Sequence, residues 1–204
     1  MIEPELAKVT SNAGFDLTPL TTTQATAMAK TKKLNMVQRH VIFGAGTEPP
    51  FTGRTTNDYK QSNKRRGTYS CALCGLPSYS SRHKFNSGTG WPSFYQPFDP
   101  DHVWEKTDTS HGVVRKEVLC SRCHAHQGHV FTDGPRPTNL RYCINAAALT
   151  FAPSTSSDEE TEARGAEAFW SFWSRLLHVK KSQPSSSKNV KEQDEVPATV
   201  NEKT

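Results

Sequence analysis

Cysteine is scarce in this chain, and the way it is used excludes one common class of protein. Only five cysteines occur among 204 residues. A small secreted scaffold held by disulfide bonds has more cysteines in a shorter chain. We therefore expect a reducing compartment, in which these cysteines bind a metal or take part in chemistry.

Long apolar segments are absent as well. No run of about eighteen apolar residues occurs, so the sequence predicts no membrane-spanning helix. Glu3 and Glu5 stand at the N-terminus, where a secretory signal would have an apolar segment. We expect a cytoplasmic protein. The threonine-rich residues 17–40 faintly resemble an organelle transit segment, which makes the mitochondrion the alternative.

Hydrophobic side chains are few, at 34% of all residues. A chain that packs along its whole length normally has more of them, so we expect unpacked ends. Residues 1–40 are predicted to form a mobile arm with one short helix near 23–34. Towards the C-terminus we expect an acidic linker at 153–162, an amphipathic helix at 163–181 and a disordered tail at 182–204.

The predicted C-terminal helix has an apolar face and basic residues at its end. Its apolar side chains recur at helical spacing: Phe169, Phe172, Trp173 and Leu176. Docking of this face on the folded core is the first interpretation. Association with a membrane surface or a protein partner is the second.

Residues 41–152 differ in composition from the two ends and are predicted to form one loop-rich, mainly β domain. Glycine and proline recur every few residues, and short runs rich in β-branched and aromatic residues lie between them. The predicted strands lie within residues 68–71, 111–119, 129–131 and 141–151.

Four of the five cysteines form two Cys-x-x-Cys pairs. Cys71 and Cys74 make the first pair, and Cys120 and Cys123 make the second. Each pair can present two thiolates on a tight turn, and two pairs complete a tetrahedral zinc site with no open position. We therefore predict one structural Zn²⁺ that stabilises the fold. Two unrelated redox-active or buried pairs are the alternative.

Cys143, the fifth cysteine, has neighbours that suit a reactive thiol. In a strand, Arg141 and Asn145 would point to the same side as Cys143. Arg141 would stabilise a thiolate there, and Asn145 could donate a hydrogen bond. Three histidines follow the second metal pair: His124, His126 and His129. A buried and inert cysteine is the alternative interpretation.

Residues 87–94 form the other unusual stretch, in which two glycines flank Thr89 and the aromatic residues Trp91 and Phe94 follow. With this loop included, the chain resembles the type B methionine sulfoxide reductases from residue 46 to residue 151. Besides both Cys-x-x-Cys pairs, the matching segments are residues 46–53, 87–94, 111–112, 126–131, 133–137 and 140–145.

The resemblance implies a fold and a reaction. The fold consists of antiparallel sheets stapled by a zinc site of four cysteines. The reaction is the reduction of the R epimer of methionine sulfoxide in proteins, a repair of oxidative damage. Cys143 would attack the sulfoxide sulfur and become a sulfenic acid.

The resemblance also implies roles for further residues. His126 and His129 correspond to the proton donors, and Arg141 to the cation beside the nucleophile. Asn145 and Asp133 correspond to residues that orient the site. Trp91 corresponds to the aromatic residue that packs against the methyl group of the substrate, and sulfur-bound methyl groups contact aromatic rings favourably. Phe94 follows closely in the sequence and offers further aromatic surface, so we predict that both residues bind the substrate.

Thr89 departs from the pattern of many family members, which carry a second, resolving cysteine at this position. No other cysteine remains outside the two metal pairs. The resemblance therefore implies a single-cysteine form, whose sulfenic acid is reduced by an external thiol such as thioredoxin. We expect oxidised proteins and this thiol as partners, and a monomer.

Two other classes of function stay open from the residues alone. A binding module would recognise an acidic or oxidised partner with Cys143 buried, and the net charge of +5 supports it weakly. A cysteine hydrolase would use Cys143 and His129, but the sequence has no signature of an oxyanion hole. We expect no nucleic-acid partner.

Overall fold

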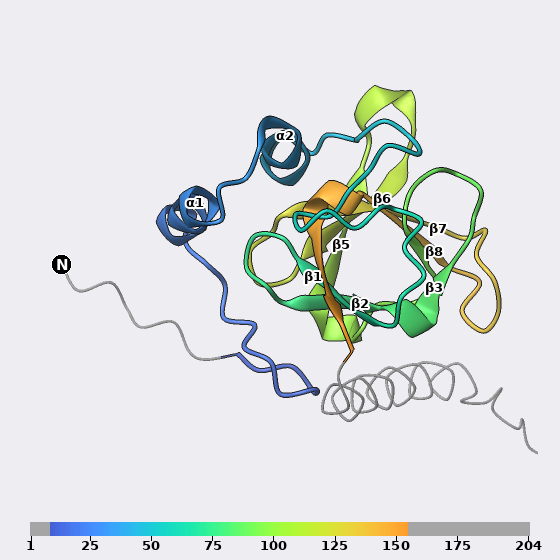
Figure 1. The fold of residues 1–204 in the computed structure, drawn as a ribbon, viewed down its shortest axis with the longest axis horizontal. Coiled ribbons are helices and arrows are strands. Elements are labelled where there is room, and N and C mark those ends of the chain that lie inside the picture. The colour runs from blue at the N-terminus through green and yellow to red at the C-terminus, as the bar shows by residue number, and fades with distance from the viewer. Residues whose placement is uncertain (1–8, 155–204) are drawn as a thin grey trace, which may run out of the picture.

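The structure is a computed structural model that describes residues 9–154 (Figure 1). Two α-helices come first, α1 (Thr22–Thr31) and α2 (Met36–Gly44), and they lie together outside the sheets. Among residues 9–154, no helix is long and apolar enough to cross a membrane. The predicted amphipathic helix at 163–181 and the predicted tail at 182–204 lie outside the described residues.

The strands form two antiparallel sheets, which confirms the predicted mainly β fold. The smaller sheet has the order β2–β1–β9, with β1 (Gly67–Cys71), β2 (Pro77–Ser80) and β9 (Leu149–Pro153). The larger sheet has the order β3–β4–β8–β7–β6–β5. Its strands are β3 (Lys84–Phe85), β4 (Ser93–Phe94), β5 (Val103–Asp108), β6 (Arg115–Cys120), β7 (His126–Phe131) and β8 (Arg141–Ile144).

Short 3₁₀ helices interrupt two of the predicted strands. The predicted run 141–151 contains both β8 and β9, because the turn Ala146–Ala148 separates them. The predicted run 111–119 begins inside the turn Ser110–Gly112, and only its later part belongs to β6. Two further 3₁₀ helices lie at Ser81–His83 and Pro100–His102.

Within the predicted N-terminal arm, the short helix expected near residues 23–34 corresponds to α1, and a second helix that was not predicted, α2, follows it. Two helices form there, and each begins with a capping box in which side chain and backbone exchange hydrogen bonds. Thr21 pairs with Gln24 at the start of α1, and Asn35 pairs with Gln38 at the start of α2. These pairs satisfy backbone N–H groups that would otherwise have no partner in a helix.

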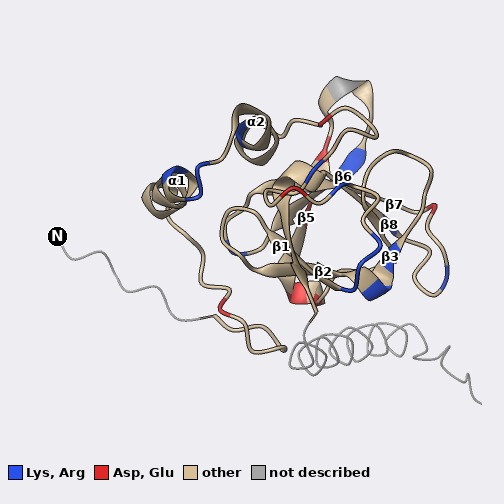
Figure 2. Ribbon diagram, viewed as in Figure 1, with Lys and Arg blue, Asp and Glu red and all other residues tan. Residues whose placement is uncertain are grey.

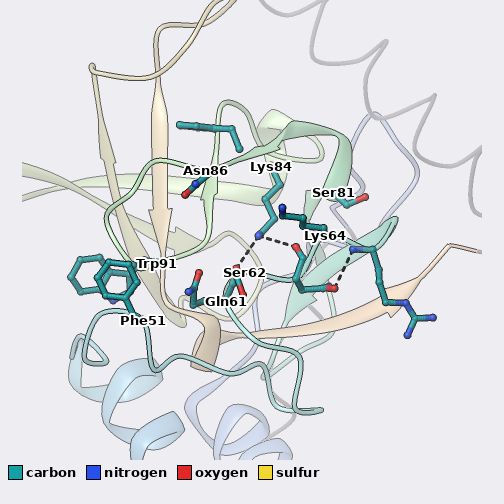
Figure 3. A pocket seen from close by; sticks show the side chains of 12 residues that line it. Phe51, Gln61, Ser62, Lys64, Ser81, Lys84, Asn86 and Trp91 are labelled. Carbon is teal, nitrogen blue, oxygen red and sulfur yellow. Dashed lines mark hydrogen bonds between the residues drawn. The ribbon is translucent and has the colours of Figure 1, made fainter.

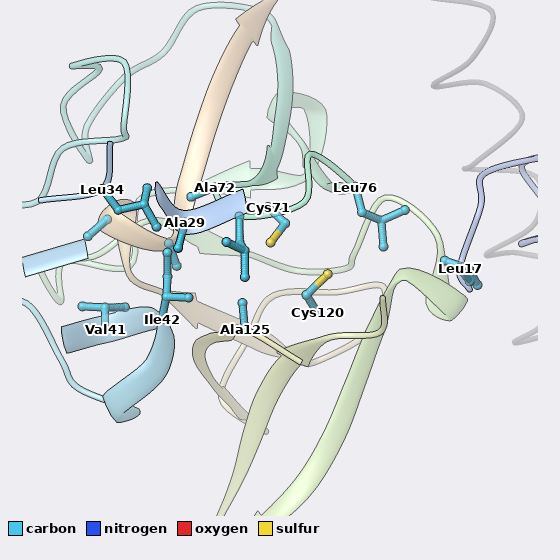
Figure 4. Packing of buried hydrophobic residues seen from close by; sticks show 13 residues of the cluster. Leu17, Ala29, Leu34, Val41, Ile42, Cys71, Ala72, Leu76, Cys120 and Ala125 are labelled. Carbon is cyan, nitrogen blue, oxygen red and sulfur yellow. The ribbon is translucent and has the colours of Figure 1, made fainter. Parts of the chain in front are cut away.

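Some of the apolar residues of this N-terminal region are buried against the β domain, although others such as Met36 and Phe43 are exposed. Ala29, Leu34, Val41 and Ile42 pack in one cluster with the cysteine turns of β1 and β6 (Figure 4). Burial of aliphatic side chains stabilises such a contact by about 1.5–3 kcal/mol for each large residue. The low overall hydrophobicity of the sequence therefore did not reveal that this region packs over the cysteine cluster.

The strand register places one row of side chains across the larger sheet. Directly opposed residues on neighbouring strands share a face of the sheet. From β3 to β5, the row contains Phe85, Ser93, Cys143, His129, Glu117 and Lys106. The adjacent row faces the other way and supplies core residues that pack against the smaller sheet: Phe94, Tyr142 and Val130. One face of the larger sheet thus carries Cys143 and the polar residues of its row, and the other face contributes to the hydrophobic core.

Candidate active site and metal centre

The two Cys-x-x-Cys pairs fold as the same turn twice. The Gly75 N–H donates to the Cys71 carbonyl at 2.9 Å, and the His124 N–H donates to the Cys120 carbonyl at 2.8 Å. Gly75 and His124 occupy equivalent positions, with φ angles of 80° and 56°. Both angles are left-handed, a conformation that glycine adopts readily and that His124 adopts at some cost. His124 therefore belongs to the metal turn.

The four thiols converge on one point. The sulfurs of Cys71 and Cys123 lie 3.6 Å apart, those of Cys74 and Cys120 lie 3.5 Å apart, and all four lie within 4.8 Å of one another. A tetrahedral zinc with Zn–S distances of ~2.3 Å separates its sulfurs by about 3.8 Å. The donor set and the spacing therefore fit a closed metal site that ties β1 to β6.

The proton affinities of the clustered thiols show why a cation suits them. Hydrogen bonds from Cys120, and then from Cys123 and Cys74, lower the pKa of Cys71. Hydrogen bonding to Cys123 and to the other two thiols, together with burial, raises the pKa of Cys120. One thiolate is thus stabilised at the expense of a neighbour, and a divalent cation would let all four ionise.

Cys143 lies on β8, between Ser93 of β4 and His129 of β7, and its side chain is partly exposed. The hydroxyl oxygen of Thr89 lies 3.9 Å from its sulfur. β7 approaches β8 very closely here, since a Cβ at Gly128 would lie 2.1 Å from the Cys143 carbonyl oxygen. Only glycine fits at that position, and it allows His129 to lie opposite Cys143.

Arg141 is held mainly by a carboxylate. Its Nε and Nη2 groups each donate to Asp133 at 2.9 Å, and its guanidinium lies 4.4 Å from the ring centre of Phe131. Burial raises the pKa of Cys143, and Arg141 and Thr89 lower it only in part. Arg141 thus favours the thiolate in the predicted direction, but burial outweighs the guanidinium, whose charge Asp133 partly cancels.

Two carboxylates hold the two histidines. The Nδ1 of His126 lies 2.8 Å from Glu117, and the Nε2 of His129 lies 2.8 Å from Asp108. The two rings meet edge to face with centres 5.5 Å apart. Sequence reasoning missed both carboxylates, because their pairing with the histidines depends on the register of β5, β6 and β7. Cys143 therefore lies opposite His129, one of two imidazoles that a carboxylate orients.

The surroundings of His126 and of Asp108 determine the protonation of these two side chains. Burial lowers the pKa of His126, although the hydrogen bond with Glu117 opposes this effect. A neutral His126 donates its Nδ1–H to Glu117, and its buried Nε2 has no hydrogen-bond partner among residues 9–154. Hydrogen bonds from Ser110, and then from His129, lower the pKa of Asp108, which therefore stays a carboxylate beside His129.

Asn145 uses its amide to fix the end of β8 and does not direct it at the thiol. Its Nδ2 donates to the Gln127 carbonyl at 3.1 Å, and its Oδ1 accepts from the Glu48 N–H at 3.0 Å. The Glu48 side chain is 3% exposed and accepts the N–H groups of the two residues after Asn145, at 2.6 and 2.8 Å. The backbone carbonyl of Glu48 accepts the indole N–H of Trp91 at 3.0 Å. Glu48, which sequence reasoning missed, thus joins the Trp91 loop to the end of β8.

The structure separates the two aromatic residues predicted to bind substrate. Trp91 is partly exposed and lines a cavity of about 390 Å³ together with Phe51, which is 67% exposed (Figure 3). Phe94 is 0% exposed and stacks on Tyr79, with ring centres 4.4 Å apart. The prediction for Phe94 is wrong, because neighbouring strand residues face opposite sides and Ser93 takes the side of Cys143. Phe51 was missed, although it lies in the matching segment 46–53.

Comparison with known proteins agrees with this geometry. The SelR domain matches residues 34–153. A protein from Xylella fastidiosa (strain M23) named peptide methionine sulfoxide reductase MsrB is 48% identical over 143 residues, which cover 70% of this chain and 88% of that protein. A protein of the same name from Caulobacter vibrioides (strain NA1000 / CB15N) is 50% identical over 145 residues, covering 71% and 87%. Another, from Thiobacillus denitrificans, is 52% identical over 121 residues, covering 59% and 88%.

The matched region contains both cysteine turns, the Trp91 loop and the strand of Cys143. It also covers more than half of the chain, so the likeness extends well beyond a short motif. The chain therefore belongs to the SelR-domain family, the type B methionine sulfoxide reductases.

Proposed function

We propose that this reductase acts on the R epimer of methionine sulfoxide in oxidised proteins, with Cys143 as the attacking group. The observation that carries the proposal is the position of Cys143. It is a single, partly exposed thiol outside the metal cluster, and it lies opposite His129 beside the Trp91 loop. The names of the relatives support the class of reaction.

In the first half-reaction, oxygen passes from the substrate sulfur to the sulfur of Cys143. A thiol and a sulfoxide become a sulfenic acid and a thioether, so the cysteine loses the two electrons that the substrate gains. The thiol proton ends on the transferred oxygen. Because burial favours the protonated thiol, Cys143 itself supplies this proton.

The histidines are placed to move the proton. His126 carries a buried Nε2 that has no hydrogen-bond partner among the described residues and can accept a proton, and the Nε2 of His129 lies 2.8 Å from the carboxylate of Asp108. His129 lies directly opposite Cys143 in the sheet. We assign donation to the sulfoxide oxygen to His129, which regains its proton from the Cys143 thiol, while the ring of His126 packs edge to face against it.

An apolar wall, which begins at Trp91 two residues after Thr89, suits the end of the methionine side chain. Trp91 and Phe51 line the same cavity, and a methyl group on sulfur gains about 0.3–1.5 kcal/mol from contact with an aromatic ring. Asn145 and Asp133 act as positioning residues, because the first fixes the end of β8 and the second fixes Arg141. The substrate sulfur would thus be presented to Cys143 from the aromatic side.

The second half-reaction needs a thiol from outside. Thr89 offers a hydroxyl near Cys143, and the other four cysteines are held in the metal cluster. An external thiol would condense with the sulfenic acid to give a mixed disulfide and water, and a second thiol would release Cys143. A dithiol protein such as thioredoxin supplies both thiols.

Zn²⁺ is the metal that the four-thiolate cluster would hold, given its soft donors and its spacing. When bound, the ion would stabilise the fold and supply no chemistry to the reaction. Cys71, Cys74, Cys120 and Cys123 would all be ligands, which leaves Cys143 as the one thiol available for catalysis.

The proposal is tested with peptides that contain a single R or S methionine sulfoxide and with dithiothreitol as reductant. We expect the wild-type enzyme to reduce the R peptide and to leave the S peptide unchanged. Cys143→Ser should lose reduction of the R peptide, while Thr89→Ser, which keeps the hydroxyl, should retain it. Reduction of the R peptide by Cys143→Ser at the wild-type rate would refute the assignment.

A further inference from the structure

A basic cavity continues from the aromatic wall of the site (Figure 3). Its lining combines an aromatic end with a cationic end: Phe51, Gly90 and Trp91 at the first, and Lys64, Arg65 and Lys84 at the second. Thr89 lies two residues before Trp91 and contacts the Cys143 thiol. In the sheet, the lining residue Phe85 lies opposite Ser93, which lies opposite Cys143. The cavity therefore lies on the side of the Trp91 loop, with β4 between its lining strand β3 and the strand β8 that carries Cys143.

All the charged side chains that line this basic cavity are cationic. No acidic residue lines it among the described part of the chain, and no described carboxylate forms an ion pair with Lys64, Arg65 or Lys84. Figure 2 shows Lys and Arg gathered beside β3 and on the segment before β1. Burial, and then the charge of Lys64, lowers the pKa of Lys84 to about 8. An anion bound in the cavity would offset the electrostatic repulsion between these cations.

The three cations differ in how firmly they are held. The Lys84 ammonium donates to the carbonyls of Gln61 and Asn63 at 2.8 and 3.0 Å, which leaves one of its three N–H donors for a ligand. The Arg65 guanidinium lies 5.7 Å from the ring centre of Tyr59, and Lys64 is exposed. One fixed cation and two exposed ones can surround a carboxylate of the substrate.

We infer that the basic cavity binds acidic side chains that lie near the oxidised methionine in the substrate protein, so the enzyme prefers methionine sulfoxide in acidic segments. The inference rests on the proposed function, because it needs a methionine sulfoxide held at Cys143 within a polypeptide. An extended chain advances about 3.3 Å per residue, so residues next to the bound methionine must pass over the surface beside Trp91. The acidic side chains of these neighbouring residues would enter the basic cavity at that point.

The sequence also contains an acidic segment shortly after the last described residue, Ser154. The Ser154 N–H donates to the Arg66 carbonyl at 3.1 Å, next to the cationic end of the cavity. Four acidic residues follow within a short distance in the sequence: Asp158, Glu159, Glu160 and Glu162. The experiment must therefore distinguish the substrate from this internal segment.

The test compares two peptides that contain one R methionine sulfoxide and differ only in their flanking residues, which are glutamates in one and glutamines in the other. At low salt we expect kcat/KM of the full-length enzyme to be about threefold to tenfold higher for the glutamate peptide. The double variant Lys64→Gln/Arg65→Gln should bring this ratio close to one and leave the rate on the glutamine peptide unchanged. Added salt should shrink the ratio in the wild type, because exposed charges are screened.

A matched control removes two charges elsewhere. Lys30→Gln/Lys32→Gln changes two exposed lysines at the end of α1, and it should keep the wild-type ratio. Equal kcat/KM for the two peptides in the wild type would overturn the inference. An equal loss on both peptides in Lys64→Gln/Arg65→Gln would overturn it too, because the two cations would then be structural.

Two further outcomes separate the sources of failure. A preference that emerges only after Asp158, Glu159, Glu160 and Glu162 are neutralised would assign the cavity to the internal segment and overturn the inference. Reduction of the glutamine peptide without any preference for glutamate refutes the inference alone. Failure to reduce either peptide, or free methionine sulfoxide, refutes the proposed function as well.

Discussion

The molecule holds cysteine in two contrasting regions. In the cysteine cluster, four thiols converge from two copies of the same turn, under aliphatic side chains from α1 and α2. On β8, Cys143 stands alone and partly exposed, facing a histidine and a hydroxyl. The surroundings of the sulfur, and not the residue type, therefore separate a structural cysteine from a reactive one.

The two regions are connected through the larger sheet. Cys120 ends β6, and Cys143 lies on β8, with β7 hydrogen-bonded to both strands. β7 carries His126 and His129, so the strand that orients the imidazoles begins just after the second metal turn. A metal ion bound by the four cysteines would support the proposed catalytic thiol by holding this strand in place.

The largest expected effect comes from breaking the cysteine cluster. Cys120→Ala removes one of four ligands and leaves three buried thiols without a complete site. Metal binding in small zinc domains contributes on the order of 10 kcal/mol to folding, so we expect the variant to lose its metal and its cooperative thermal unfolding. Circular dichroism during heating and elemental analysis of the purified protein measure both.

Cys143→Ala is the matched change in the other region. It removes the same atom from a partly exposed strand position, so we expect a stability change of less than about 1 kcal/mol and a full metal content. Activity should nevertheless be lost. Wild-type unfolding and metal content in Cys120→Ala would contradict the structural role assigned to the cluster.

The second comparison contrasts the two aromatic residues that the sheet places on opposite sides. Phe94→Ala should lower the free energy of unfolding by about 3–5 kcal/mol, because it leaves a cavity beside Tyr79. Trp91→Ala should change stability much less and raise KM for the sulfoxide peptide. Denaturant titration and steady-state kinetics test both variants, and a reversed pattern would place Phe94 in the substrate site.

The third comparison concerns charge around the reactive thiol. Burial raises the pKa of Cys143, so less thiolate exists at neutral pH than in an unfolded cysteine, and alkylation should quicken by about tenfold per pH unit up to that pKa. Asp133→Asn removes a charge that raises this pKa and leaves Arg141 to lower it. The side chain of Asp133 is 63% exposed, so the variant should fold.

We therefore expect Asp133→Asn to react several-fold faster with iodoacetamide at pH 7, measured on the peptide that contains Cys143. Asp58→Asn removes another exposed charge that pairs with Arg54 instead, and it should leave the rate unchanged. Equal rates in all three proteins would show that Arg141 and Asp133 do not control the proton on Cys143.

Local motifs made the cysteine cluster and the general β architecture predictable. Each Cys-x-x-Cys pair needs only one tight turn, and the two pairs together define the ligand set. The partners of the histidines could not be predicted in this way. Glu117 meets His126, and Asp108 meets His129, only because three strands align in one register that no short segment encodes.

Two other differences between prediction and structure also have physical reasons. Residues 9–44 contain few apolar side chains, but Leu34, Val41 and Ile42 are all buried against the cysteine turns. Average composition does not reveal such placement. Phe94 was assigned to the substrate site because it follows Trp91 closely in sequence, whereas alternation along β4 turns it into the core.

The most direct test of the central claim is mass spectrometry of the enzyme after a single turnover with an R methionine sulfoxide peptide and no reductant. We predict one added oxygen on Cys143, trapped as a sulfenic acid by a dimedone probe, with the other four thiols unmodified and the metal retained. Thr89→Cys serves as a reference, since a thiol near Cys143 should give an internal disulfide instead. In the wild-type enzyme, a disulfide from Cys143 to Cys71, Cys74, Cys120 or Cys123 would contradict the division between structural and reactive cysteines.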